Sequence, residues 1–275
     1  MENSGSVKFL YGTAFGRGIL KMIQGLHMDR IAVWFLRSRL SRCIIRRYIK
    51  NNKIPMELYE KAEYRTFREF FLREKLDKTF DREANHLISP CDGWLSVYPI
   101  EENQSFFLKG SHYKVEDLIQ NPETAALFQG GLCLVFRLCA SDYHHYCYVD
   151  DGTGENAHYI EGKLHSVQPI ACETYPVFSQ NRRVWTLLHT EHFGPVVQTE
   201  IGALVVGGIV NRQSGPFRKG EEKGRFELSG STIALFLQKN QVQLREKLQK
   251  ALQTAPEVRV NFGDWVAART DSLGE

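Results

Sequence analysis

The sequence predicts an α+β fold in which a basic, helical N-terminal cap precedes a β-rich core that carries a C-terminal helix. Of its 275 residues 43% are hydrophobic and 24% charged, which is typical of a folded globular protein. Apolar residues recur every three to four positions through the first 53 residues, whereas short apolar or alternating runs begin at Leu87. Because no linker or internal repeat interrupts the chain, we expect a single domain over residues 1–275, with a helical layer at 1–75 and a β-rich catalytic core at 76–275.

The charge of the cap is strongly asymmetric. Residues 1–53 hold eleven Lys or Arg and two acids, a net charge of +9, so the remaining residues carry −6 of the total of +3. The apolar spacing between these cations indicates amphipathic helices with basic faces. Such helices can lie on an anionic bilayer, or they can pack on the core with a solvated basic face. No nucleic-acid-binding signature accompanies the cluster, and we expect no nucleic acid as a partner.

Local patterns place the remaining elements. A second helical stretch is predicted over residues 54–75, where Thr66 and Glu69 have the spacing of a capping box before Phe67, Phe70 and Phe71. The strand signals are Trp94–Ile100, Leu132–Leu138, Tyr146–Val149, Val184–Leu188, Val196–Gly208 and Ser231–Leu237. A last amphipathic helix is predicted over Val242–Leu252.

Several protein classes are disfavoured by what the sequence contains. The longest apolar run, Ile201–Val210, has ten residues with three glycines, too short for a transmembrane helix. The N-terminus lacks the pattern of a secretory signal, so we expect a protein that faces the cytosol. Six scattered cysteines form no C-x-x-C pair, which favours neither a disulfide framework nor a zinc ribbon, and we expect no metal.

Reactive side chains gather in three segments far apart in the chain. Asp92 lies in the turn Ser89-Pro90-Cys91-Asp92-Gly93, and His144 and His145 are adjacent in Asp142-Tyr143-His144-His145-Tyr146-Cys147. The third segment is Gly230-Ser231-Thr232 before an apolar strand. Taken singly, an Asp-Gly pair is usually a turn and a Gly-Ser pair a bulge, and at most one of two adjacent histidines in a strand faces a given site.

Together the three segments resemble the phosphatidylserine decarboxylases, a pyruvoyl-dependent family with a Gly-Ser-Thr near the C-terminus. The resemblance covers most of the chain. Its two further pieces are Phe70-Phe71-Leu72-Arg73 before the Asp92 turn, and Asn181-Arg182-Arg183-Val184 together with Glu200-Ile201-Gly202-Ala203, Val206-Gly207 and Ile209. Five short pieces in the family's order identify the chain as a member of that family.

The resemblance implies a self-cleaving proenzyme. The Ser231 hydroxyl would attack the carbonyl of Gly230, and elimination from the resulting ester would leave a covalent pyruvoyl group derived from Ser231. The products would be residues 1–230 (β chain) and 231–275 (α chain), held together as an αβ heterodimer. The pyruvoyl ketone would form a Schiff base with phosphatidylserine and act as the electron sink for its decarboxylation to phosphatidylethanolamine. An Asp-His-Ser relay would activate the hydroxyl, with Asp92, His144 and Ser231 as catalytic residues.

The sequence departs from the family pattern at one position of that relay. The family usually carries a second histidine three residues after the first, and here that residue is Cys147. His144 could serve both self-cleavage and decarboxylation, His145 could enter the relay, or Cys147 could take part as a thiolate. We favour His144, because a thiol with a pKa of about 8.5 is a poor substitute for neutral imidazole. The departure leaves slow or impaired maturation open.

The implied lipid substrate favours the membrane interpretation of the cap. We expect phosphatidylserine and an anionic membrane surface as partners, with the protein peripheral on the cytoplasmic face of the cell membrane. The expected contact residues are Trp34, Phe35, Arg37, Arg39, Arg42, Arg46 and Arg47. Three alternatives remain: a catalytically impaired membrane-binding relative, a pyruvoyl decarboxylase of another amino acid, and a serine hydrolase. The hydrolase is disfavoured because Ser231 does not lie in a Gly-x-Ser-x-Gly elbow.

Overall fold

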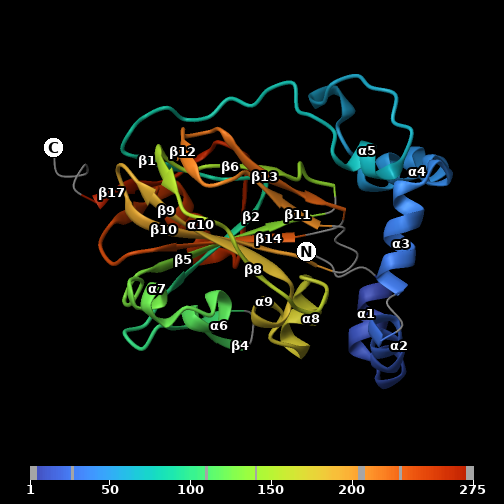
Figure 1. The fold of residues 1–275 in the computed structure, drawn as a ribbon, viewed down its shortest axis with the longest axis horizontal. Coiled ribbons are helices and arrows are strands. Elements are labelled where there is room, and N and C mark those ends of the chain that lie inside the picture. The colour runs from blue at the N-terminus through green and yellow to red at the C-terminus, as the bar shows by residue number, and fades with distance from the viewer. Residues whose placement is uncertain are drawn as a thin grey trace.

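The computed structural model describes residues 5–25, 28–108, 111–139, 141–203, 208–228 and 231–270, and it confirms the predicted α+β class. Helices dominate the N-terminal region and strands dominate the rest (Figure 1). The helices are α1 (Gly5–Gly12), α2 (Ala14–Gly25), α3 (Met28–Arg37), η1 (Arg39–Ser41), α4 (Arg42–Asn52), η2 (Met56–Leu58), α5 (Phe67–Phe71), α6 (Val115–Ile119), α7 (Pro122–Ala126), α8 (Pro169–Thr174), α9 (Val177–Gln180) and α10 (Glu246–Thr254).

A large antiparallel sheet forms the centre of the molecule. Its strands, in spatial order, are β12 (Gly215–Phe217), β7 (Gly152–Gly154), β9 (Arg183–Thr190), β10 (Gly194–Ile201), β14 (Ser231–Leu237), β5 (Leu132–Leu138), β2 (Gly93–Pro99) and β16 (Val258–Val260), with β8 (His158–Ile160) paired to β9. Strand β14 is paired on both sides, with Ser231 opposite Leu138 of β5 and Thr232 opposite Ile201 of β10. A strand so enclosed is fully buried, as the continuous apolar run of its sequence predicts.

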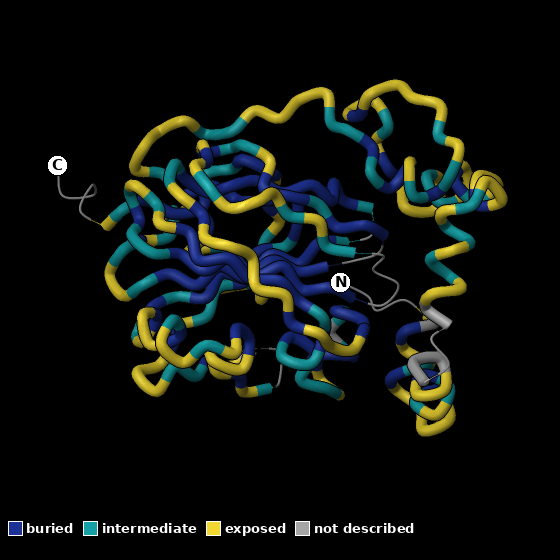
Figure 2. Tube along the Cα trace, viewed as in Figure 1, coloured by how far each residue is buried: buried dark blue, intermediate teal, exposed yellow. Residues whose placement is uncertain are grey.

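Three smaller antiparallel sheets surround the large one. They are β11 (Gly208–Asn211), β13 (Glu222–Glu227) and β6 (His145–Cys147); β1 (His86–Ile88), β17 (Trp265–Arg269) and β15 (Val242–Leu244); and β3 (Ser105–Leu108) with β4 (Ser111–Lys114). The two faces of the large sheet bury two separate cores. Figure 2 shows the central strands of the sheet as buried. One core lies toward β6, β13, β17 and helices α4 and α5, and the other toward α6 to α9.

The basic cap joins the first of these cores through α4 and α5. Ile45 of α4 and Phe67, Phe70 and Phe71 of α5 are buried, and the rings of Tyr48 and Phe67 meet edge-to-face with centroids 4.9 Å apart. The Thr66 hydroxyl caps α5 by accepting a hydrogen bond from the Glu69 amide, at 3.1 Å. The predicted helical stretch over 54–75 is shorter than expected: only Met56–Leu58 and Phe67–Phe71 are helical. Pro55 precedes the first of these turns, and extended backbone separates the two.

The strand predictions are confirmed at β2, β5, β6, β9 and β14, with ends that differ by a few residues. The strand predicted over Val196–Gly208 is confirmed only as far as Ile201, where β10 ends. Gly202 and Ala203 belong to no strand, residues 204–207 lie outside the described residues, and Gly208 begins β11.

The prediction of one helix over Val242–Leu252 is wrong at its start. Residues Val242–Leu244 form β15, which pairs with β17, and α10 begins only at Glu246. The alternation of Val242, Gln243 and Leu244 suits a strand as well as a helix, and pairing with β17 decides between them. Among the described residues, no helix combines the length and apolarity that crossing a bilayer requires.

Candidate active site

Ser231 opens strand β14 and its side chain is completely buried. Alternate residues of a strand share a face, and Ile233, Leu235 and Leu237 all belong to the core that also contains Phe71, Tyr143 and Cys147. Ser231 therefore projects toward the side of the sheet where the other candidate residues gather. Its Oγ has no hydrogen-bond partner among the described residues. A buried hydroxyl normally finds a partner, and the unpartnered Oγ of Ser231 is therefore available for chemistry, as are several other buried hydroxyls of the structure.

His144 immediately precedes β6 and is also fully buried. Its ring packs on Phe71 with centroids 4.1 Å apart, and its carbonyl accepts a hydrogen bond from the Phe226 amide. Nδ1 lies 2.9 Å from the carbonyl oxygen of Asp142. Because that oxygen can only accept, Nδ1 carries the proton and the Nε2 lone pair is available. Nε2 has no partner in the described part of the chain.

Burial sets the protonation state of this imidazole. Burial, with a smaller contribution from the nearby Arg73 guanidinium, lowers the pKa of His144 to about 3, although the Asp142 carbonyl and the Asp92 carboxylate oppose the shift. His144 is consequently neutral at physiological pH. A neutral imidazole with a free, buried Nε2 has the form that a general base requires.

Asp142 positions the His144 ring through its backbone carbonyl, and several hydrogen bonds fix Asp142 itself. Its carboxylate accepts a bidentate pair of hydrogen bonds from Arg259, at 2.9 and 3.0 Å, and one from the Cys139 amide at 2.7 Å. Its carbonyl accepts from both His144 and the buried Arg73. Arg73 is itself fixed between the rings of Tyr59 and Phe70, at 4.3 and 4.9 Å. These contacts fix the orientation of the His144 ring.

Asp92 lies in the predicted turn before β2, with only 4% of its surface exposed. Its carboxylate is 2.7 Å from the Lys75 ammonium and accepts a hydrogen bond of 2.8 Å from the Phe262 amide. Sequence reasoning missed Lys75, because nothing in its neighbourhood indicates a buried ion pair with a residue seventeen positions later. The ion pair with Lys75 compensates the Asp92 carboxylate for its burial.

The three predicted catalytic residues face one core but are not directly bonded to one another. Asp92 acts on His144 through its charge, and no hydrogen bond joins Asp92, His144 and Ser231 among the residues that the structure describes. Gly230, the predicted partner of Ser231 at the cleavage site, lies outside those residues. Just before it, Leu228 is fully buried with φ of 66°, a left-handed conformation that is rare for a branched side chain.

The two alternative relay residues have different surroundings. Burial raises the pKa of the Cys147 thiol well above its ordinary value, and the thiol faces the Ser89 carbonyl at 3.9 Å. His145 stacks on Tyr143 and donates from Nδ1 to Glu222 at 3.0 Å. A protonated thiol is a poor base, and His145 is already engaged with an acid of β13. These surroundings favour His144.

One group near His145 has the composition of a metal site. Ligand atoms of Glu74, His145 and Glu222 lie within 4.8 Å of one another. Glu74, however, accepts hydrogen bonds from Lys78 at 2.6 Å and from Tyr143 at 2.9 Å, and the pKa of its carboxyl is lowered by the Lys78 and His145 charges. Protein cations therefore already neutralise this carboxylate, and we assign no metal to the group.

A second ion pair lies on the same side of the sheet. Lys223 of β13 donates to Glu200 of β10 at 2.8 Å, and both side chains are at most 2% exposed. Asn211 donates to the other Glu200 oxygen at 2.8 Å and accepts from Tyr146 at 2.7 Å. Glu200 pairs across the ladder with Ile233, two residues along β14 from Ser231. The sequence indicated Glu200 only through the family resemblance, and it gave no signal for Lys223.

Comparison with known proteins points to one family. The family model described as phosphatidylserine decarboxylase matches residues 66–268. A Clostridium acetobutylicum protein, phosphatidylserine decarboxylase proenzyme 2, is 37% identical over 98% of this chain and 93% of its own length. The phosphatidylserine decarboxylase proenzymes of Clostridium kluyveri and Desulfitobacterium hafniense are 34% and 30% identical, each over 96% of this chain and over 92% and 91% of their own lengths.

Proposed function

The chain belongs to the phosphatidylserine decarboxylase family, and we propose that it converts phosphatidylserine to phosphatidylethanolamine with a pyruvoyl group made from its own Ser231. The observation that carries this proposal is the pair of buried, unpartnered atoms, Ser231 Oγ and His144 Nε2, that face the same core. Other buried polar atoms of the described residues also lack partners, but these two belong to residues that the family resemblance assigns to the relay. A site built for proton transfer leaves one donor and one acceptor available.

In the proposed maturation, the Ser231 oxygen attacks the carbonyl carbon of Gly230 while His144 Nε2 takes the hydroxyl proton. The peptide C–N bond breaks as the C–O bond of an ester forms, and the proton passes to the released amine. Elimination then opens the ester, leaving the Gly230 carboxylate and a dehydroalanine at residue 231. Hydrolysis of its enamine releases ammonia and gives the pyruvoyl ketone. Cys147 and His145 take no part in these steps.

Once formed, the ketone would hold the amine of the substrate as a Schiff base and accept the electron pair released with carbon dioxide. The protein's own groups would supply the rest. His144 is neutral and held by Asp142, so its Nε2 could accept a proton from the substrate ammonium group as the Schiff base forms and return that proton to the substrate carbon after carbon dioxide leaves. The Asp92 carboxylate, which pairs with Lys75, would stabilise His144 when its ring carries a proton. The buried surroundings exclude water from the reacting atoms.

The fold supports the proposed αβ heterodimer of residues 1–230 and 231–275. After cleavage, β14 would open the shorter piece, and its neighbours β5 and β10 belong to the longer one. Strands β16 and β17 of the shorter piece likewise pair with β2 and β1 of the longer. Ladders on both sides of β14 would keep the pieces together without a covalent bond.

The cap supports the proposed membrane surface as a partner, with the enzyme peripheral on the cytoplasmic face of the membrane. Trp34 is 66% exposed on α3, and Arg39, Arg42, Arg46 and Arg47 are exposed on η1 and α4. Exposed tryptophan among arginines suits the boundary of an anionic bilayer. Arg37, by contrast, is engaged with Glu227 of the core at 2.8 Å.

Two measurements test the proposal. Intact-mass analysis of purified protein should show two chains divided between Gly230 and Ser231, the shorter beginning with a ketone, and Ser231→Ala should remain one chain. The matured protein should release carbon dioxide from the serine carboxylate of phosphatidylserine in mixed micelles. A single chain without turnover would favour the catalytically impaired relative, and two chains that decarboxylate only a free amino acid would favour the other pyruvoyl enzyme.

A further inference from the structure

Three arginines of the cap line one cleft. Arg39 of η1, Arg42 at the start of α4 and Arg65 of the loop before α5 surround a space of about 380 Å³. Their side chains come from two segments more than twenty residues apart, so the tertiary fold, rather than local sequence, brings the charges together. Like charges repel, and such a grouping is stabilised when an anion occupies it.

These charges are not used by the fold. None of the three guanidinium groups forms an ion pair or hydrogen bond within the described residues. Their neighbours along the chain behave differently, since Arg37 and Arg68 both pair with Glu227. The guanidinium group presents planar donors that match the oxygens of a phosphate. The cleft therefore offers three unengaged phosphate-binding side chains.

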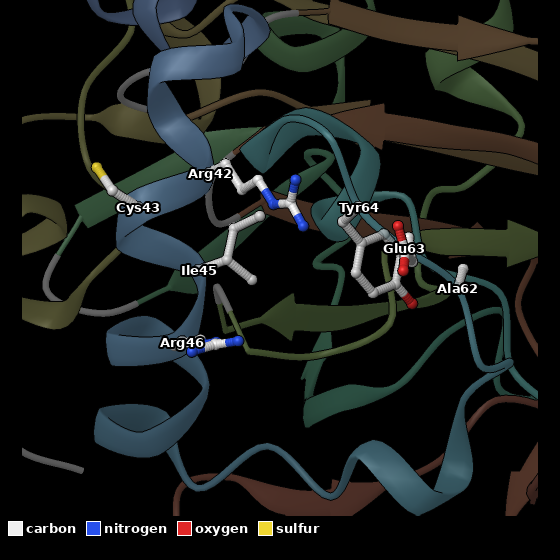
Figure 3. Close-up of a pocket in the computed structure, with 7 residues that line it drawn as sticks. All are labelled: Arg42, Cys43, Ile45, Arg46, Ala62, Glu63 and Tyr64. Atoms are coloured by element: carbon white, nitrogen blue, oxygen red, sulfur yellow. The ribbon is translucent and has the colours of Figure 1, made fainter.

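An adjoining cleft indicates which end would take the phosphate. This second space of about 530 Å³ shares Arg42 and lies between α4 and residues 62–64, with Arg42 pointing across it toward Tyr64 (Figure 3). The residues that line it include Glu63 as well as Arg42 and Arg46. A phosphate would be repelled by Glu63 there, whereas no acid lines the three-arginine cleft among the described residues.

The surroundings favour a lipid as the source of the phosphate. Leu40, which lies between Arg39 and Arg42 in the chain, is 67% exposed, and Ile31 and Trp34 of α3 are 61% and 66% exposed. A soluble phosphate gains nothing from exposed apolar side chains, but a phospholipid at a bilayer surface does. We infer that Arg39, Arg42 and Arg65 form a binding site for the phosphate of an anionic phospholipid, built from residues other than those of the candidate active site. This inference rests on the proposed function only in taking the membrane as the partner.

The test measures binding rather than turnover. Full-length protein carrying Ser231→Ala stays in one chain, so its partitioning onto vesicles is independent of maturation and of decarboxylation. The site variant Arg39→Gln, Arg42→Gln, Arg65→Gln is compared with a control variant, Arg47→Gln, Lys50→Gln, Lys61→Gln, which removes the same charge from exposed positions outside both clefts. Vesicles contain phosphatidylcholine with or without phosphatidylglycerol. Urea unfolding confirms that both variants are folded.

Diffuse attraction to the surface would weaken binding equally in both variants, because each surface cation contributes roughly the same free energy. A phosphate site predicts that the site variant partitions about tenfold or more weakly than the control variant onto phosphatidylglycerol vesicles. Equal losses in the two variants would overturn the inference. Inorganic phosphate, replacing chloride at constant ionic strength, should displace the parent protein but not the site variant. Phosphate that binds the parent protein and is not displaced by vesicles would show a site for the free ion, and would overturn the assignment to lipid.

Discussion

Arg68 of α5 and Glu227 of β13 form an ion pair that ties the helical cap to the strand leading into the candidate cleavage segment. Arg37 of α3 binds the other oxygen of the same carboxylate at 2.8 Å. Both arginines lower the pKa of the Glu227 carboxyl. Glu227 is 7% exposed and lies four residues before Ser231. We call Glu227 the anchor, because its ion pairs connect the cap to the chain segment that contains the proposed cleavage site.

Replacing Glu227 by Gln should destabilise the protein by about 1–2 kcal/mol and slow self-cleavage, because the two arginines lose a partly buried partner. Urea unfolding in the Ser231→Ala background measures the first effect, and a gel time course of chain splitting measures the second. Glu57→Gln, an exposed acid of η2, serves as the control. Cleavage at the parent rate in Glu227→Gln would show that the anchor does not position the cleavage segment.

The same anchor predicts an acid-sensitive cap. The folded pKa of Glu227 lies below its ordinary value of 4.5, so its contribution to stability is fully present above that pH and is lost as pH falls through the folded value. Trp34 fluorescence is confounded by the other tryptophans, but a single Trp variant retaining Trp34 would report release of α3. We expect release below about pH 4.5 in the parent and no such transition in Glu227→Gln.

His144 should give maturation an unusual pH profile. An imidazole with an ordinary pKa of 6.5 loses its basic form as pH falls below that value, whereas burial lowers the pKa of His144 to about 3. The rate of chain splitting should therefore stay flat between pH 8 and about pH 5. His144→Gln should abolish splitting across the range. A rate that falls with a midpoint near 6.5 would point to a solvent-accessible histidine in place of His144.

The buried pair of Lys75 and Asp92 should behave as a unit. Lys75→Met leaves the Asp92 charge in the core with the Phe262 amide as its one hydrogen-bond partner among the described residues, and should cost about 3–5 kcal/mol of stability. Asp92→Asn should cost a similar amount, and the double variant less than the sum of the two. Urea unfolding of the four proteins in the Ser231→Ala background gives the coupling. Additive costs would mean that the contact contributes little to folding.

Restoring the family's second histidine tests the account of Cys147. Cys147→His inserts a larger ring at a fully buried position and should destabilise by about 1–3 kcal/mol. It should nevertheless speed chain splitting if His144 alone carries out the proton transfer slowly. Cys147→Ser, which adds no imidazole, should leave the rate unchanged. An unaltered rate in Cys147→His would count against the view that this substitution weakens the relay.

Patterns of local sequence predicted much of the fold. Continuous apolar runs such as Leu132–Leu138 became central strands because only a strand enclosed on both sides can bury every side chain of so short a run. The prediction of a helix from Val242 was wrong because the pattern of three residues cannot distinguish a strand from a helix. Pairing with β17, which lies far along the chain, decides the outcome.

The candidate site was predictable only in part. The resemblance supplied Asp92, His144 and Ser231, which the fold turns toward one core. The orienting roles of other residues could not be predicted in this way, although Arg73 lies in one piece of the resemblance. Arg73, Arg259 and Lys75 act across sequence separations that carry no periodic signal, and ion pairs of this kind are visible only once the chain has folded.

The left-handed Leu228 has a consequence for the direction of the proposed reaction. A branched residue in that conformation costs roughly 1–2 kcal/mol, and here it persists between the anchored Glu227 and the enclosed β14. Cleavage after Gly230 would free one end of the segment between Glu227 and Ser231. Leu228 could then adopt a backbone conformation with negative φ. Rejoining the ends would require Leu228 to return to the left-handed conformation. The relief of that conformational cost would therefore favour the cleaved state over the intact chain.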